Sequence, residues 1–279
     1  MKNALLTPSR RRAAAFGLVS LVCAVFVVAA SANHNWRKFH WARTSNPFTV
    51  KLGNNLSSGW SSYLTTAASD WDNGSSVLDT DVVAGQSNSS CAPTMGRVEV
   101  CNANYGNTGW LGIASVWASG SHITQGTVKN NDYYFNQPRY DTPAWRLFVT
   151  CQEVGHTFGL DHQDERFNNI NLGSCMDYTN DPSGKAGTNG TLNNEHPNAH
   201  DYNQLATIYS HVDGSTTVGQ QNAAAKMPPA ALDIIIEGPG QWGKLVRGGR
   251  EQGWSDYELD FGGGHRVITH VIWASEEHQ

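Results

Sequence analysis

Residues 152–162, which read Gln-Glu-Val-Gly-His-Thr-Phe-Gly-Leu-Asp-His, constrain this chain more than any other stretch. An apolar stripe in the preceding residues predicts a helix that reaches into this stretch. Side chains four positions apart lie on one helix face, so Gln152 and His156 can reach a single metal ion. Gly159 suits a sharp turn, often with positive φ, that brings His162 back to the same ion. The stretch therefore predicts a metal site.

The same stretch resembles the motif H-E-x-x-H-x-x-G-x-x-H of the metzincin zinc metallopeptidases, a group that includes the matrixins and astacins. Gln152 stands where that motif has its first histidine. The resemblance implies a Zn²⁺ ion held by Gln152, His156 and His162. It also implies that Glu153 is the general base for a metal-activated water that attacks a peptide bond. The resemblance thus indicates a secreted zinc endopeptidase with a polypeptide substrate.

A second stretch, Cys175-Met176-Asp177-Tyr178, is similar to the methionine turn that follows the zinc motif in metzincins. By this resemblance Met176 lies beneath the metal as a structural residue, and Tyr178 stabilises the oxyanion of the transition state. Gly159 is the corresponding structural glycine of the motif. The order of expected elements over residues 45–213 also matches the family, although only the two short stretches carry specific motifs.

Gln152 departs from the family pattern, and a glutamine amide oxygen is an uncommon zinc ligand. Three interpretations stay open. Gln152 coordinates the metal, another group completes the site, or the chain is an inactive binding protein on the same scaffold with Gln152 hydrogen-bonded in place. No spacing recommends His122, His196 or His200 as the replacement ligand, and we assign these histidines no site role.

The resemblance and the hydrophobic periodicity together predict an α+β fold of metzincin type. It has a twisted, mostly parallel sheet with an antiparallel edge strand, an active-site helix, the methionine turn and a C-terminal helix. The edge strand, residues 109–114, is expected to pair with extended substrate. The apolar patterns predict strands at 48–52, 77–83, 97–100, 109–117 and 123–135 in the main domain, and at 232–236, 257–261 and 265–273 in the C-terminal segment. They predict helices at 57–71, from 143 into the motif, and at 200–211.

The N-terminus has the layout of a secretory signal, because three arginines precede an apolar run that ends in small residues. We therefore expect a signal peptide at 1–32 and a peptidase-like domain at 33–213. A polar linker at 214–229 and a small β-rich segment at 230–279 follow. Removal of the signal takes away Lys2 and the three arginines, which moves the formal charge from −5 to −9. We expect no nucleic-acid partner, and no membrane association after signal cleavage.

Four cysteines remain after signal removal, which favours two disulfides in an exported chain. Three pairings are open, and we favour Cys91 with Cys101 and Cys151 with Cys175 because each closes a short local loop. The second would also tie the zinc motif to the methionine turn. Tryptophans of the C-terminal segment suggest a polysaccharide contact, although aromatic residues in a small β unit are more often core: Trp242, Trp254 and Trp273.

Overall fold

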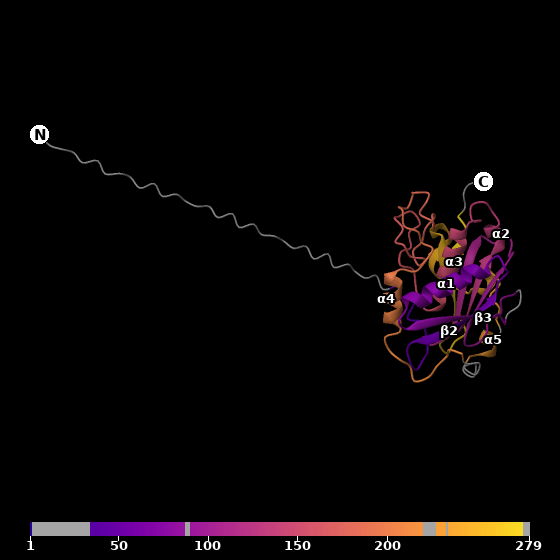
Figure 1. Ribbon diagram of the computed structural model, residues 1–279. Helices are drawn as coiled ribbons and strands as arrows, with labels where there is room; N and C mark the ends of the chain where they lie inside the picture. The colour runs from indigo at the N-terminus through magenta and orange to yellow at the C-terminus, as the bar shows by residue number, and fades with distance from the viewer. Residues whose placement is uncertain (2–33, 87–89, 220–226, 233, 276–279) are drawn as a thin grey trace. The chain divides into compact units, whose positions relative to one another are not determined.

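The computed structural model describes residues 1, 34–86, 90–219, 227–232 and 234–275 (Figure 1). The expected signal peptide, apart from Met1, lies outside these residues. The chain from Asn33 to Gln279 forms one compact unit. No helix in the described part of the chain has both the length and the apolar character needed to cross a membrane.

A single mixed sheet forms the centre of this unit and has nine strands among the described residues. The strands are β1 (His40–Trp41), β2 (Phe48–Asn55), β3 (Leu78–Ala84), β4 (Val98–Ala103), β5 (Trp110–Ser119), β6 (His122–Asn131), β7 (Lys244–Gly249), β8 (Trp254–Asp260) and β9 (His265–Trp273). Their order is β3-β2-β4-β6-β5-β9-β8-β7, and β1 also pairs with β6. The fold is therefore of the expected mixed α+β class.

The two halves of the sheet differ in strand direction. Strands β1, β2, β3, β4 and β6 pair in parallel, whereas β5, β9, β8 and β7 form antiparallel pairs. The antiparallel strand β5 is not at the edge, because β9 pairs with it along nearly its whole length. The expectation of a free edge at residues 109–114 is therefore wrong. The C-terminal strands bury the hydrogen-bonding groups that a substrate would have used.

The helices are α1 (Ser61–Gly74), α2 (Asp132–Phe135), α3 (Pro143–Thr157), α4 (Ala199–Ile208) and α5 (Pro229–Leu232), with short 3-10 turns at Pro239–Gln241 and Arg250–Gln252. The helix α3 begins where expected: Pro143 occupies its first turn and the Thr142 side chain accepts a hydrogen bond from the Trp145 amide. Helices α1 and α3 pack against each other and against the sheet (Figure 1). These contacts hold α3 in place.

Strand β9 divides the apolar residues of the molecule between two cores. Side chains alternate along a strand, so Ile268 and Ile272 face the main core beneath α3, whereas Val267 and Val271 face a second core. The second core includes Trp110, Trp117, Trp242 and Trp273. Both faces of the C-terminal strands are therefore covered in part by apolar side chains.

Two expected strands end or lie elsewhere in the structure. Residues 132–135 form the short helix α2 and do not continue β6, while residues 234–236 lie outside any strand; β7 was not foreseen.

Trp242, Trp254 and Trp273 are only 0, 3 and 6% exposed. Their indoles fill the cores, as is usual for aromatic residues in a small β unit. The polysaccharide contact stays a prediction.

The shared core predicts how substitutions in the C-terminal strands affect stability. Replacing the buried Ile272 by Ala should lower the free energy of unfolding by about 2–5 kcal/mol, because it leaves a cavity in the main core. Replacing Leu245 by Ala on β7, where 45% of the residue is exposed, should change it by less than about 0.5 kcal/mol. Urea denaturation should show one transition in both variants. Separate transitions for the C-terminal strands would contradict a shared core.

Candidate metal centre

The end of helix α3 and the turn behind it position the motif histidines as the sequence indicates. Helix α3 ends at Thr157, and Gly159 has a φ of +90°. A β-carbon at this glycine would collide with the carbonyl oxygen of Phe39, so only glycine fits the turn. The turn returns the chain so that the Nε2 atoms of His156 and His162 lie 3.0 Å apart. The predicted sharp turn with positive φ is confirmed.

A third histidine, His270 of β9, completes the cluster. One ring nitrogen from each of His156, His162 and His270 lies within 4.8 Å of the other two, and all three side chains are buried. His270 reaches the cluster because β9 pairs with β5 in a register that sets it opposite Ala114. On its other side it lies opposite Asp256 of β8. The C-terminal segment thus adds a third histidine to the two histidines of the motif.

Hydrogen bonds at the far ring nitrogens orient two of these imidazoles. His156 Nδ1 donates to the Leu160 carbonyl at 2.9 Å, and His270 Nδ1 lies 2.9 Å from a carboxylate oxygen of Asp256. The other Asp256 oxygen accepts a hydrogen bond from Trp36 Nε1 at 3.2 Å. Asp256 thus acts as an acceptor on both oxygens, and His270 Nδ1 is the donor. These bonds leave the Nε2 lone pairs directed into the cluster.

Burial keeps the cluster histidines neutral. It lowers the pKa of His156 to about 3, with a further contribution from neighbouring His270, and it also lowers the pKa of His270 to about 3. The pKa of His162 is lowered well below its usual value, first by burial and then by His156. Neutral imidazole is the form that binds transition metals, and three imidazoles suit Zn²⁺. The donor set therefore fits a zinc ion.

Gln152 is also buried, and the two ends of its side-chain amide differ in their hydrogen bonds. Its Nε2 donates to the Cys175 carbonyl at 2.8 Å, whereas its Oε1 has no hydrogen-bond partner among the described residues. The donor bond ties α3 to the methionine turn. The role of Gln152 as a ligand stays a prediction, and the presence of His270 removes the need for it.

Glu153 and Tyr178, the two residues expected to act on substrate, are both fully buried beside the cluster. A β-carbon at Gly112 of β5 would lie 2.8 Å from a Glu153 carboxyl oxygen, so the absence of a side chain at Gly112 makes room for Glu153. Burial and the Asp256 carboxylate raise the pKa of Glu153 well above its usual value, and the backbone of Ala114 offsets this only in part. Neither Glu153 oxygen makes a well-formed hydrogen bond among the described residues.

Tyr178 contacts the histidine cluster directly. Its hydroxyl lies 2.8 Å from His270 Nε2, and its ring centroid lies 4.4 Å from that of His162. On the other side Phe167 stacks on the Tyr178 ring, with centroids 4.8 Å apart. Burial raises the pKa of Tyr178, so the phenol keeps its proton and can act as a donor.

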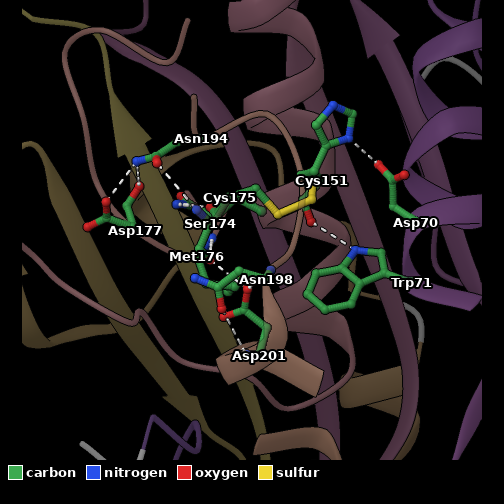
Figure 2. The surroundings of a disulfide bond; sticks show 12 residues. Asp70, Trp71, Cys151, Ser174, Cys175, Met176, Asp177, Asn194, Asn198 and Asp201 are labelled. Carbon is green, nitrogen blue, oxygen red and sulfur yellow. Dashed lines mark hydrogen bonds and ion pairs between the residues drawn. A yellow bond between two sulfur atoms is a disulfide. The ribbon is translucent and has the colours of Figure 1, made fainter. Parts of the chain in front are cut away.

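Met176 packs against helix α3, and both expected disulfides form; the place of Met176 beneath a metal stays a prediction. A β-carbon at Gly155 would lie 2.6 Å from Met176 Sδ, which shows that the thioether packs against helix α3. Cys151 and Cys175 form the disulfide that joins α3 to the methionine turn (Figure 2). Cys91 and Cys101 form the other. The prediction of two disulfides is confirmed.

A polar network fixes the methionine turn (Figure 2). Ser174 Oγ donates to Asp201 at 2.6 Å and accepts from the Met176 amide at 2.9 Å, and Asn194 Nδ2 donates to Asp177 at 2.8 Å. Burial raises the pKa of Asp177 to about 7. The second oxygen of Asp177 has no hydrogen-bond partner among the described residues. The network holds Met176 and Tyr178 in place.

Phe167 belongs both to the lining of a cavity and to the ring contacts of the site. A cavity of about 990 Å³ is lined in part by Phe167, Gly253 and Arg166. The Phe167 ring also stacks on the ring of Tyr178, which contacts His162 and His270. One aromatic ring thus links this cavity to the cluster.

Sequence reasoning missed His270 and Asp256, although a signal was present. In the expected strand 265–273, alternation places His270 on the same face as Ile268 and Ile272, where an apolar residue is expected. A histidine at such a position is usually an ordinary core residue, and the sequence did not reveal which strand would lie beside β5. Only the pairing of β9 with β5, two strands distant in sequence, places His270 beside the motif histidines.

The raised pKa of Asp177 predicts how an amide substitution changes stability with pH. The folded state holds the carboxyl proton more tightly than the unfolded chain, so wild type loses stability as the pH rises between about 4 and 7. Asp177→Asn does not titrate. Its stability relative to wild type should therefore rise between pH 4 and pH 8 by at least about 1.4 kcal/mol, the equivalent of one pKa unit. Urea denaturation of both proteins across this range measures the difference, and a constant difference would contradict the prediction.

Comparison with known proteins gives limited help. No family model matches this chain, and no curated protein matches it. Among solved structures, myroilysin is similar with 15% sequence identity and a TM-score of 0.35, over 63% of this chain and 98% of myroilysin. At this identity and TM-score the likeness supports neither a family nor an activity.

Proposed function

We propose that the chain is a zinc-dependent peptidase whose metal is held by His156, His162 and His270. The convergence of three neutral, buried imidazoles beside Glu153 and Tyr178 carries this proposal. Zinc bound there would supply a Lewis acid that activates water and polarises a peptide carbonyl. Gln152 then need not be a ligand, which resolves the departure of the sequence from the metzincin pattern.

Glu153 serves as the general base and acid in this proposal. Its buried position favours the protonated carboxyl when no cation is near, and a nearby cation would favour the carboxylate. As a carboxylate it accepts a proton from the attacking water. It then gives that proton to the leaving amine, so the residue returns to its starting state.

Tyr178 serves as the donor to the oxyanion. Its raised pKa keeps the hydroxyl protonated, and in the described arrangement this hydroxyl bonds to His270 Nε2. A metal held by His270 would use the same Nε2 lone pair, which would leave the Tyr178 hydroxyl as a donor for the substrate oxygen.

Substrate approaches, in this proposal, through the cavity that Phe167 lines. Strand β9 occupies the outer side of β5, so a polypeptide cannot add there as an extra strand. The Phe167 ring that lines the cavity stacks on Tyr178. Displacement of that ring would open a path toward Tyr178 and Glu153. Flexible peptide segments suit this route better than folded surfaces do.

The two disulfides support an exported protein. Disulfides persist in oxidising compartments, and this chain has Cys91 bonded to Cys101 and Cys151 bonded to Cys175. We therefore propose that the protein acts outside the cell after removal of the signal peptide at 1–32.

A second candidate function is an inactive binding protein with a structural metal. One observation favours it: Glu153 and the whole histidine cluster are buried, whereas peptidase sites need access. In this reading zinc joins α3 to β9 and no substrate reaches it. Catalysis by the purified protein distinguishes the two candidates.

Metal content tests the identity of the third ligand. His270→Gln should lower the zinc content by one ion per chain, because the ring nitrogen of His270 is lost. Gln152→Ala should leave the zinc content unchanged. His265→Gln is the matched control, since His265 lies on the same strand outside the cluster. Elemental mass spectrometry of the four purified proteins gives the answer. Loss of zinc in Gln152→Ala with retention in His270→Gln would reverse the assignment.

Activity on an unfolded protein substrate tests the role of Glu153. Glu153→Gln keeps the size of the side chain but cannot accept a proton, so the hydrolysis rate should fall by about 100-fold or more with zinc content unchanged. Peptide products can be followed by mass spectrometry. Wild type that holds zinc yet cleaves nothing would support the binding protein, and undiminished cleavage by Glu153→Gln would reject the catalytic assignment.

A further inference from the structure

We infer that the chain has a second metal site, remote in sequence from the zinc motif, formed by His40, His211 and Asp213, with His122 beside Asp213. His40 lies in β1 and His122 begins β6, whereas His211 and Asp213 follow α4. One ligand atom from each of His40, His211 and Asp213 lies within 4.8 Å of the others. This site is independent of the proposed peptidase function.

The distances between these atoms match a shared metal ion. Asp213 Oδ1 lies 3.2 Å from His122 Nε2, 3.5 Å from His40 Nε2 and 3.7 Å from His211 Nε2. The Nε2 atoms of His40 and His211 lie 3.3 Å apart. Ligands at tetrahedral positions about 2.0–2.1 Å from zinc lie about 3.3–3.4 Å from one another. Two of the four distances are too long for good hydrogen bonds.

Neighbouring groups aim the ligand atoms into this site. His40 Nδ1 lies 3.0 Å from the Lys38 carbonyl, which makes Nδ1 the donor and leaves a lone pair on Nε2. Arg43 Nη1 donates to Asp213 Oδ2 at 2.8 Å, so this oxygen is occupied and Oδ1 faces the histidines. Such outer partners fix the tautomer and orientation of metal ligands.

His40 and Asp213 are largely buried, whereas the site is open to solvent beside His122 and His211. The side chains of His40 and Asp213 are 8 and 10% exposed, whereas those of His122 and His211 are 37 and 52% exposed. A cation can therefore enter from solvent. Arg43 opposes a cation, but its charge is balanced by Asp213 and its guanidinium lies over the Tyr209 ring.

The ligand set selects the class of metal. Two imidazoles and one carboxylate suit Zn²⁺ and related divalent transition ions better than Ca²⁺ or Mg²⁺, which prefer oxygen ligands. Three protein ligands leave a fourth position of a tetrahedral ion for water. The ion would join β1 and the chain after α4, which the backbone bond from the amide of Asp213 to the carbonyl of Arg43 already links.

Cobalt binding tests this assignment, because tetrahedral Co²⁺ with nitrogen ligands absorbs visible light. The full purified protein, stripped of metal, is titrated with Co²⁺ and then with Zn²⁺ as a competitor. His211→Gln should bind one ion fewer per chain, or bind it at least about tenfold more weakly. His196→Gln is the matched control: its side chain is 45% exposed and pairs with Asp70 outside the site. It should bind as wild type does.

Zinc should also raise the melting temperature of wild type and of His196→Gln more than that of His211→Gln. His40→Gln provides a second test at the other histidine of the group, and it should weaken the same binding event. Equal metal number and affinity in wild type, His211→Gln and His40→Gln would overturn the site. Because His270→Gln leaves these residues intact, loss of metal in that variant reports only on the proposed peptidase centre.

Discussion

The pairing of β9 with β5 is the interaction on which the rest of the structure depends. Its register sets His270 opposite Ala114, on the face that α3 covers, and the pairing of β9 with β8 sets His270 opposite Asp256. A shift of one residue would turn every side chain of β9 to the other face, which would remove His270 from the motif and put Val267 and Val271 in the wrong core. Apolar packing on both faces thus fixes the position of a polar site residue.

A chain of charged groups links the C-terminal strands to the motif loop. Arg247 of β7 pairs with Asp161, which precedes His162, and lies 3.6 Å from Asp256. The Arg247 guanidinium also lies over the Trp254 ring at 5.1 Å from its centroid. These contacts help balance the charge of Asp256, whose carboxylate orients His270. The histidine cluster can therefore stay neutral and buried without leaving an isolated charge in the core.

Local patterns in the sequence predicted most of what local interactions decide. The helix through the motif, the positive φ at Gly159, the alternation of β9 and the two disulfides all follow from short spacings. The neighbours of β5 could not be predicted in this way, because strand order depends on contacts between distant segments. His270 and Asp256 were missed for that reason.

The third histidine of the cluster comes from strand β9 and not from position 152 of helix α3, and this changes how formation of the cluster depends on folding. With a histidine at position 152, all three ligands of the motif would come from one helix and its following turn, so the site could form before the C-terminal strands pair. With Gln152 bonded to the Cys175 carbonyl and His270 in the cluster, three imidazoles converge only after β9 has joined β5. If the proposed site binds a metal, the affinity adds to the stability of that pairing, since binding to the native state alone favours it. In the proposed site, Gln152 in place of a histidine and the closure of the sheet by β9 are therefore two parts of one arrangement.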